Sequence, residues 1–413
     1  MMIPRFITKT IIDSVKHFPI TLLTGPRQIG KSTELFNSFN SKGFNYISLD
    51  DSFNLAFARK DPRSFLDLHP SPLIIDEAQK APELFVEIER IVNESRLKRG
   101  NMESNGMYIL SGSQRKALLD RAEESLSGRV AILDMNNLSI NEILGKDNSP
   151  FEVNLAKDSQ RSLRYTLKES QAFEYIVKGF FPVLYADPSI NISVFYSSYI
   201  TTYLGKDLRD LININDEFKF LNFLKLLASN TGEELVYDNY AKNIGVSINT
   251  IKSWTSALIK TAIIYLVEPY NEESIVKRVV KRPKMYFFDT GLAAYLCGIT
   301  DAKTLQNSFL KGRFFETFVF NEIRKSFMNE GIMQTLYYYR DSEQNEVDMI
   351  LVREGKISCV EIKAGQNFNA SDTKAFKNLI NSKFVHGKNA IVCTADKISM
   401  LNDGTLLLPI SSI

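Results

Sequence analysis

Cysteine, histidine and tryptophan are scarce in this sequence of 413 residues, which contains three, three and one of them respectively. The cysteines and histidines are scattered without the spacing of metal ligands, at Cys297, Cys359, Cys393, His17, His69 and His386. We therefore expect neither a disulfide framework nor a zinc site. Such cysteine usage is typical of a reducing compartment, and we expect a cytoplasmic protein.

Long apolar runs and a strong charge of either sign are also missing. No stretch approaches 18 apolar residues, so no membrane-spanning segment is expected, and the first residues lack a secretory signal. The 50 basic and 48 acidic residues give a formal net charge of +2. A nucleic-acid surface on this chain would therefore be a local patch.

The length allows two or three hydrophobic cores. Apolar runs alternate with helical patterns in the first third of the chain, which predicts an α/β layer fold. We expect a P-loop domain over residues 1–135, a helical lid or linker over 136–217, a winged-helix-like domain over 218–284 and a second α/β domain over 285–413.

A phosphate-binding motif follows the first predicted strand, Ile20–Thr24. Residues 25–32 fit G-x-x-x-x-G-K-[ST] and precede a helical run. Glycines let backbone N–H groups surround phosphates, the lysine reaches the outer phosphates, and the serine supplies a Mg²⁺ ligand. The residues expected around the nucleotide are Gly25, Pro26, Arg27, Gln28, Ile29, Gly30, Lys31, Ser32 and Thr33.

Acidic and hydroxyl side chains that suit nucleotide hydrolysis follow later strands. In Leu73–Glu77 a strand ends in two acids, and we expect Asp76 to hold Mg²⁺ through water and Glu77 to polarise the attacking water. Ser113, or alternatively Ser111, would touch the γ-phosphate or that water. Arg129 is a candidate arginine finger, acting in cis or from a neighbouring subunit of a homo-oligomer.

These motifs resemble the AAA-type ATPase domain of a large prokaryotic ATPase family. The resemblance is carried by Leu23–Ser32, Ile47–Asp51, Ile75–Gln79, Leu110–Ser113 and Ser125–Val130, with Ser32–Thr33 where many members have two threonines. Members join this domain to a C-terminal domain of unknown function, and the second half of this chain is similar too, at 199–208, 283–292 and 361–365. The resemblance implies ATP as the nucleotide; the residues alone leave GTP open.

A helix-turn-helix pattern occupies the middle of the chain. Residues 240–247 lead into a helix with Ile251, Trp254 and Leu258 on one face, and Ser247 is a candidate N-cap. A basic segment follows at 277–284. This arrangement would place cations along a DNA backbone; alternatively, it forms a rigid lid.

Three acids and a lysine in the C-terminal part suggest a second site. Strands over 346–352 and 357–363 would place Asp348 opposite Glu361 and Lys363, and Glu316 would join them from a helix. The layout resembles the PD-(D/E)xK restriction-endonuclease-like fold, which implies a second Mg²⁺ or Mn²⁺, held by Asp348 and Glu361, and water activation for phosphodiester hydrolysis. A hairpin with one charged, solvated face is the alternative.

Three hypotheses follow for the function. The first is a Mg²⁺-dependent AAA-type ATPase whose turnover acts on the C-terminal region and, through it, on DNA. The second is a metal-dependent DNA nuclease gated by ATP. The third is a nucleotide switch with negligible turnover that controls a DNA- or protein-binding module.

Overall fold

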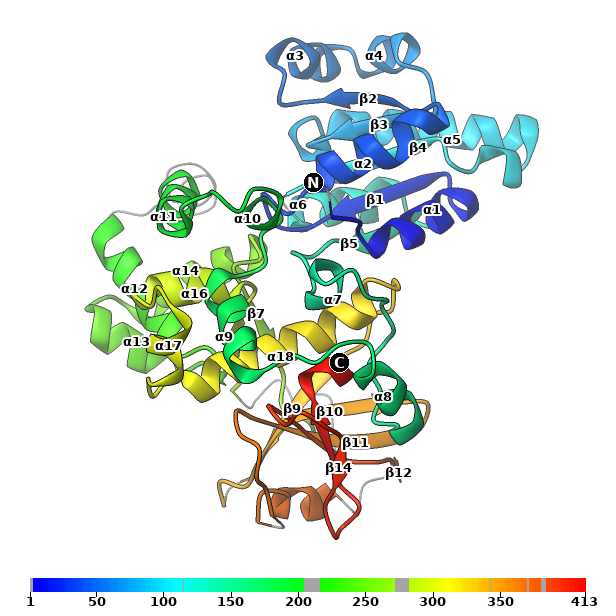
Figure 1. The fold of residues 1–413 in the computed structure, drawn as a ribbon. Coiled ribbons are helices and arrows are strands. Elements are labelled where there is room, and N and C mark those ends of the chain that lie inside the picture. The colour runs from blue at the N-terminus through cyan, green and yellow to red at the C-terminus, as the bar shows by residue number, and fades with distance from the viewer. Residues whose placement is uncertain are drawn as a thin grey trace. The chain divides into compact units, whose positions relative to one another are not determined.

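The computed structural model describes residues 3–113, 115–203, 216–271, 282–341, 343–369, 371–379 and 384–413. It divides into two compact units, whose elements are labelled in Figure 1. The first unit comprises Met1–Asn148 with the short segments Phe181–Ala186 and Met328–Ile332. The second comprises Ser149–Phe180, Asp187–Phe327 and Met333–Ile413.

The first unit is built on a five-stranded parallel sheet in the order β2-β3-β4-β1-β5. Its strands are β1 (Ile20–Thr24), β2 (Asn45–Ser48), β3 (Leu73–Asp76), β4 (Tyr108–Gly112) and β5 (Val130–Asp134). Strands β1, β3 and β4 are buried at every position, as expected for a parallel sheet covered on both faces. Because β4 lies between β1 and β3, the strand that carries Asp76 is one strand removed from the P-loop strand.

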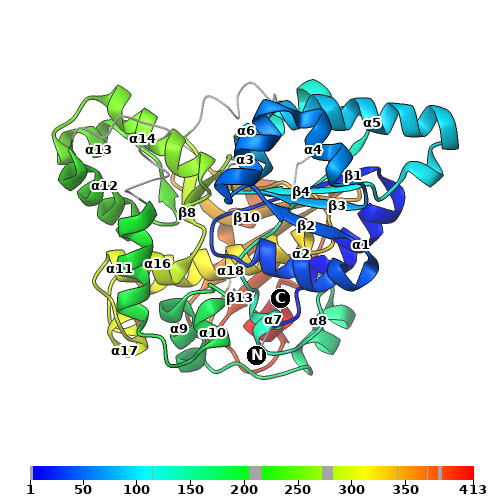
Figure 2. The same cartoon turned by 90° about the horizontal axis from the view of Figure 1, so that it is seen from above.

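Helices cover both faces of this sheet. Figure 2 shows α1 and α2 on one face and α5 and α6 on the other. The apolar positions of α5 recur at helical spacing and pack on the strands, with Leu84, Phe85, Ile88 and Val92 all buried. The helices of this unit are α1 (Ile7–His17), α2 (Lys31–Phe39), α3 (Ser52–Lys60), α4 (Pro62–Leu68), α5 (Glu83–Arg99), α6 (Arg115–Ser125), α7 (Ile140–Ile143) and α10 (Val183–Ala186).

The second unit begins with helices and a small antiparallel sheet, ordered β6-β8-β7. Its strands are β6 (Glu233–Glu234), β7 (Ile264–Val267) and β8 (Lys284–Phe287). The helices of the unit are α8 (Leu155–Ser162), α9 (Glu169–Lys178), α11 (Ile192–Tyr203), α12 (Glu217–Ser229), α13 (Tyr237–Ile244), α14 (Ile248–Lys260), α16 (Thr290–Leu296), α17 (Ala302–Gln306) and most of α18 (Lys311–Met328).

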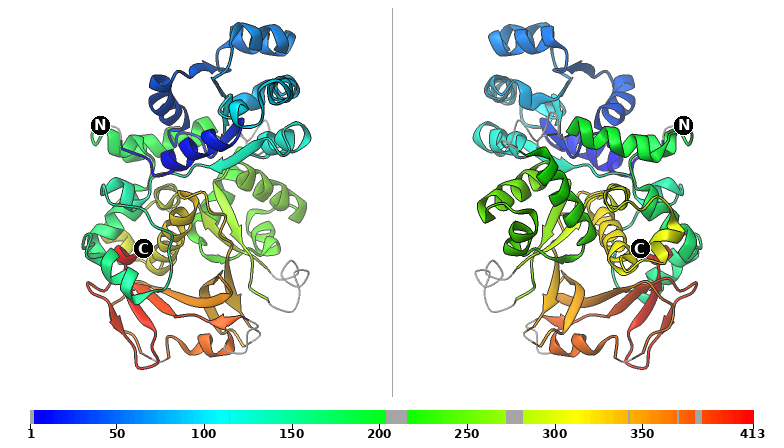
Figure 3. Two further views of the ribbon diagram at one scale, coloured as in Figure 1. Left: turned by 90° about the vertical axis from the view of Figure 1, so that its right-hand side faces the viewer. Right: turned by 90° about the vertical axis from the view of Figure 1, so that its left-hand side faces the viewer.

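The second unit ends in a mixed sheet, ordered β14-β15-β13-β11-β10-β9, with β12 beside β11. Strands β9, β10 and β11 are antiparallel, whereas β11, β13 and β15 are parallel. Figure 3 shows α18 on one side of this sheet and the short helix η5 (Lys374–Leu379) on the other. The strands are β9 (Leu336–Arg340), β10 (Glu346–Arg353), β11 (Lys356–Lys363), β12 (Val385–His386), β13 (Ala390–Cys393), β14 (Ser399–Met400) and β15 (Leu406–Pro409).

Within the described ranges, none of the helices combines the length and the apolar character needed to cross a membrane.

Candidate functional site

The phosphate loop joins β1 to α2 through backbone that few residues can adopt. Gly25 has φ 147° and Gly30 has φ 90°, and between them Gln28 is also left-handed, with φ 60°. A Cβ added at Gly25 would lie 2.3 Å from the carbonyl oxygen of Met135. The loop therefore requires glycine at position 25, and it ends at the N-terminus of α2, where free N–H groups and the helix dipole favour an anion.

Lys31 is the first residue of α2 and is buried, with 6% of its surface exposed. Its ammonium donates to the carbonyl oxygens of Gly25, at 2.8 Å, and Pro26, at 2.6 Å. Burial lowers the pKa of Lys31 to about 8, against the opposing effect of the Glu77 and Asp76 carboxylates. The Lys31 ammonium is therefore held by backbone carbonyl groups of the same loop.

Asp76, at the end of β3, is the centre of a hydroxyl network. Its Oδ2 accepts hydrogen bonds from Ser32, at 2.6 Å, and from the Tyr46 hydroxyl, at 2.7 Å. Its Oδ1 accepts one from Ser111, at 2.5 Å. Burial and the Asp76 hydrogen bond raise the pKa of Tyr46, which keeps the phenol protonated as a donor. Tyr46 was not among the residues expected from the sequence.

Glu77 follows Asp76 in a left-handed conformation, with φ 56°. Its Oε2 accepts a hydrogen bond from the side-chain amide of Gln79 and another from Ser113, at 3.3 Å. The two predicted serines therefore have different partners, because Ser111 binds Asp76 whereas Ser113 binds Glu77.

Arg129, the candidate arginine finger, lies at the opposite end of the parallel strands from the P-loop. It precedes β5, and the parallel register places the start of β5 beside Ile20, whereas the P-loop follows Thr24 at the other end of β1. Its guanidinium donates to Asn93, at 2.7 Å, and lies 3.4 Å from a Glu89 oxygen, both on α5. An arginine supplied to a neighbouring subunit stays a prediction.

Arg5 is a buried arginine that the sequence did not single out, and it binds the backbone of the P-loop. Arg5 donates to the carbonyl oxygens of Ile29, at 2.8 Å, and Asn136, at 2.6 Å. Its charge is balanced by Glu142, whose Oε1 lies 3.1 Å from the guanidinium. In the sequence, Arg5 is recognisable only as a basic residue close to residue 1, and nothing there indicates its partners.

The residues present fit a nucleotide phosphate with its magnesium ion. The glycine at position 25 keeps open a cradle that a Cβ would fill, and a lysine and a helix N-terminus supply positive charge. Ser32 and Asp76, already joined by a hydrogen bond, present the oxygen donors that Mg²⁺ prefers.

The four C-terminal residues expected to form a second site do come together. The β10–β11 register pairs Met349 with Val360, so Asp348 is opposite Glu361 one residue further along. Glu361 Oε1 lies 2.7 Å from the Lys363 ammonium. In addition to burial, the negative charges of Asp348 and Glu316 act on the Glu361 carboxyl and raise its pKa. Burial raises the pKa of Glu316 to about 7, and burial with the Asp348 charge raises that of Glu361 to about 8.

The expected second metal ion finds no support at this cluster. Across the parts of the chain that the structure describes, no group of three or more His, Cys, Asp or Glu side chains is arranged to hold a metal ion. The ammonium of Lys284 lies among the carboxylates, 2.9 Å from Glu316, 2.5 Å from Glu346 and 3.7 Å from Asp348. We therefore derive no metal-dependent cleavage step from these residues.

The helix-turn-helix pattern corresponds to α13 and α14. Gly245 ends α13 in the left-handed region, with φ 71°, and the Ser247 hydroxyl accepts a hydrogen bond from the Thr250 N–H at the start of α14. Most of the predicted basic wing, Lys277–Lys281, lies outside the described residues. Lys284 is 2% exposed and therefore cannot contribute to a basic surface, contrary to the sequence-based expectation.

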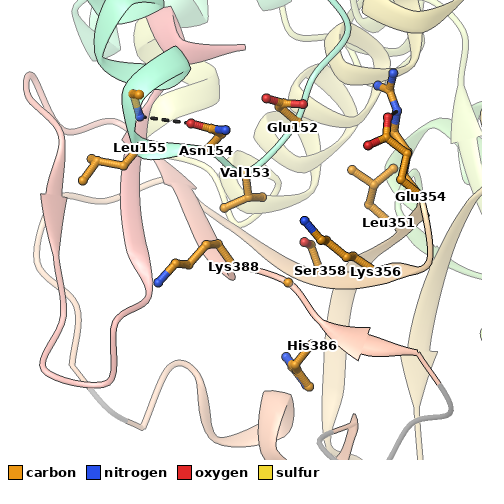
Figure 4. A pocket seen from close by; sticks show the side chains of 13 residues that line it. Glu152, Val153, Asn154, Leu155, Leu351, Glu354, Lys356, Ser358, His386 and Lys388 are labelled. Carbon is orange, nitrogen blue, oxygen red and sulfur yellow. Dashed lines mark hydrogen bonds and ion pairs between the residues drawn. The ribbon is translucent and has the colours of Figure 1, made fainter.

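A cavity of about 600 Å³ in the second unit involves none of the predicted site residues (Figure 4). Lys356, Lys388 and His386 line it together with Ser358 and Glu152. The remaining lining residues are Val153, Asn154, Leu155, Ala156, Leu351, Arg353, Glu354 and Gly387.

Comparison with known protein families assigns three segments. Residues 17–144 match an AAA domain, 169–303 match a domain of unknown function (DUF8612), and 311–413 match another (DUF4143). The chain is similar to the uncharacterized proteins Rv2008c of Mycobacterium tuberculosis and Mb2031c of Mycobacterium bovis. Each is 27% identical over 350 residues, which is 84% of this chain and 70% of the relative.

Similar solved structures include the Walker-type ATPase PABY2304 of Pyrococcus abyssi, at 15% identity and a TM-score of 0.44, covering 70% of this chain and 94% of that one. Another is the RuvB Holliday junction branch migration motor of Thermotoga maritima, at 14% identity and a TM-score of 0.30, covering 63% of this chain and 88% of that one. Neither the winged-helix nor the nuclease-like interpretation of the C-terminal half is supported by these comparisons. Residues 17–144 thus match an AAA domain, and this segment contains a five-stranded parallel sheet with a phosphate loop after β1.

Proposed function

We propose that this protein binds and hydrolyses ATP with Mg²⁺ at the P-loop. The observation that carries the proposal is the hydrogen bond of 2.6 Å from Ser32 to Asp76, which joins two motifs that lie 44 residues apart in the sequence. In this proposal Lys31 binds the outer phosphates, while Ser32 and Asp76 hold Mg²⁺, which neutralises phosphate charge when bound. Glu77, oriented by Gln79 and Ser113, positions the attacking water.

Phosphate release and binding of a fluorescent ATP analogue test these roles separately. Lys31→Ala should lose both binding and turnover, because it removes the cation that meets the phosphates. Glu77→Gln should retain binding and lose turnover by about a hundredfold or more, because it removes the group that acts on water. Lys42→Ala, at an exposed lysine just after α2, is the matched control and should turn over at the parent rate.

Two outcomes would contradict the proposal. A Lys31→Ala protein that hydrolyses ATP at the parent rate would place the activity elsewhere or in a contaminant. A parent protein that binds the analogue but releases no phosphate would favour the nucleotide switch with negligible turnover.

We further propose that ATP turnover acts on a DNA contact made by α14. The supporting observation is that the exposed side of this helix is mainly polar, with Asn249, Lys252, Ser253 and Ser256 exposed while Ile251, Trp254 and Leu258 are buried. A polar helix face that follows a turn is the form in which helix-turn-helix proteins meet DNA.

Fluorescence anisotropy with a labelled duplex, with and without ATP, tests this contact. Lys252→Glu should weaken binding by about threefold to tenfold at low salt, because it reverses one charge near the phosphate backbone. Lys225→Glu makes the same charge change on α12, at another exposed lysine, and should have little effect. Equal losses in the two variants would indicate net charge alone, and no binding by the parent would exclude the contact.

A further inference from the structure

Lys284 is a buried lysine with no role in the ATP-binding site. It opens β8 in the small antiparallel sheet and is 2% exposed. A lysine taken out of water needs anionic partners, because an uncompensated buried ammonium is strongly unfavourable. Its surroundings therefore show what it neutralises.

The partners of Lys284 are carboxylates on two other elements. Its ammonium lies 2.9 Å from Glu316 Oε1 on α18, and 2.5 Å from Glu346 Oε1 and 3.7 Å from Asp348 Oδ1 on β10. Burial alone would lower the pKa of Lys284, but Glu316, Asp348 and Glu346 hold it well above its usual value. The group is therefore a fixed positive charge among these acids.

The remaining contacts of the cluster are consistent with an ammonium rather than a metal ion at its centre. The Tyr286 hydroxyl donates to the same Glu316 oxygen, at 2.6 Å, and Asp348 Oδ2 accepts the backbone N–H of Ile362, at 2.8 Å. Glu361 Oε1 is taken by Lys363, which leaves Glu361 Oε2 as a buried oxygen without a hydrogen-bond partner. A divalent ion at this place would meet the repulsion of Lys284.

We propose that Lys284 is the resident cation between Glu316, Glu346 and Asp348, beside the Glu361–Lys363 pair, where the sequence predicted a divalent metal ion. The intact protein accordingly binds no divalent metal there. Removal of the Lys284 ammonium leaves Glu316 and Asp348 without their cation and converts the cluster into a divalent-cation site. The proposal concerns the second unit and does not depend on ATP hydrolysis.

Binding of Mn²⁺ to the full chain without nucleotide, followed by the electron paramagnetic resonance of free Mn²⁺, tests this assignment. Asp76→Asn is placed in every protein to silence the P-loop carboxylate. We expect no Mn²⁺ bound at the cluster in this background, and one Mn²⁺ bound there per chain after addition of Lys284→Met. Mn²⁺ should also raise the melting temperature of the Lys284→Met protein and leave that of its parent unchanged.

Lys325→Met is the matched control, because Lys325 is also 2% exposed and pairs with Glu322 on α18, at 2.8 Å. It should gain no Mn²⁺ site; an equal gain would show that any uncompensated buried acid suffices and would overturn the proposal. The proposal would also be overturned if the Asp76→Asn protein bound Mn²⁺ and the further change Glu361→Gln abolished that binding. If Lys284→Met fails to fold, Lys284→Gln replaces it, with the same expected gain of a Mn²⁺ site. The Mn²⁺ titration of the Asp76→Asn parent needs neither variant, and it shows whether the cluster with Lys284 in place binds the ion.

Discussion

At the scale of single residues, Asp76 connects the two halves of the nucleotide site. Three hydroxyls, from Ser32, Tyr46 and Ser111, donate to its two oxygens, so the carboxylate has one orientation. Of these donors, Tyr46 and Ser111 would orient Asp76 without touching the metal ion itself, and loss of such a partner typically costs a factor of 10 to 100 in metal affinity or activity.

Tyr46→Phe removes one of these donors and little else. We expect the Mg²⁺ concentration for half-maximal ATP turnover to rise by about tenfold, because Asp76 loses part of its orientation while Ser32 and Lys31 remain. Turnover measured over a Mg²⁺ titration gives this value, and circular dichroism checks that the fold is kept. An unchanged Mg²⁺ dependence would show that Ser32 and Ser111 hold Asp76 without the phenol.

Arg5 has a structural effect on the same site. Arg5→Met leaves the Glu142 carboxylate buried without its counter-charge and releases the Ile29 carbonyl of the P-loop. We expect a loss of about 3–5 kcal/mol in the free energy of unfolding, together with weaker nucleotide binding. The double variant Arg5→Met/Glu142→Gln should recover part of the stability, as followed by thermal unfolding, because it removes the uncompensated charge. A double variant no more stable than the single one would contradict this account.

At the scale of elements, the turn between β1 and α2 makes different demands on its two glycines. A Cβ at Gly25 would meet the Met135 carbonyl, whereas one at Gly30 would meet no atom within 4 Å and would add only the strain of its positive φ. We expect Gly30→Ala to cost about 1 kcal/mol and Gly25→Ala at least twice that, about 2 kcal/mol or more. Native-state hydrogen exchange in β1 and α2 measures the loss of stability in each variant. Equal losses would show that the Met135 backbone shifts at little cost to admit the added Cβ.

The elements of the nucleotide site were predictable because each is specified locally. The β1 strand is an apolar run over Ile20–Thr24, its bounds agree with the structure, and the motif after it fixes the start of α2. The strands β9 to β11 were likewise visible as β-like runs separated by polar turns. The order of the parallel strands could not be predicted from the sequence, because strand order depends on packing between segments far apart in the chain.

At the scale of the whole molecule, the sequence showed least about groups assembled from distant segments. Lys284 precedes Glu316 by 32 residues and Asp348 by 64, and as part of a basic stretch it was expected on a surface. The pairing of β8 with β7 and the packing of α18 bury it instead. Tyr46 and Arg5 were missed for the same reason, since neither carries a motif and their partners lie far along the chain.

The three cysteines give a prediction that covers the whole chain. Burial raises the pKa of Cys297 and of Cys393 to about 11 and that of Cys359 to about 12. At pH 8 the folded protein should therefore contain about a hundredfold less thiolate than free cysteine, and since the thiolate is the reactive form, Ellman's reagent should react correspondingly slowly.

Denaturant should release three fast-reacting thiols per chain, and the rate for the folded protein should rise about tenfold per pH unit. Because the folded state holds these protons more tightly than the unfolded state, stability should fall as the pH rises from about 9 to 11. Cys297 is partly exposed, whereas the other two are buried. Cys297→Ser should therefore remove most of the slow reaction, and a thiol that reacts as fast as free cysteine in the folded protein would contradict the burial of these side chains.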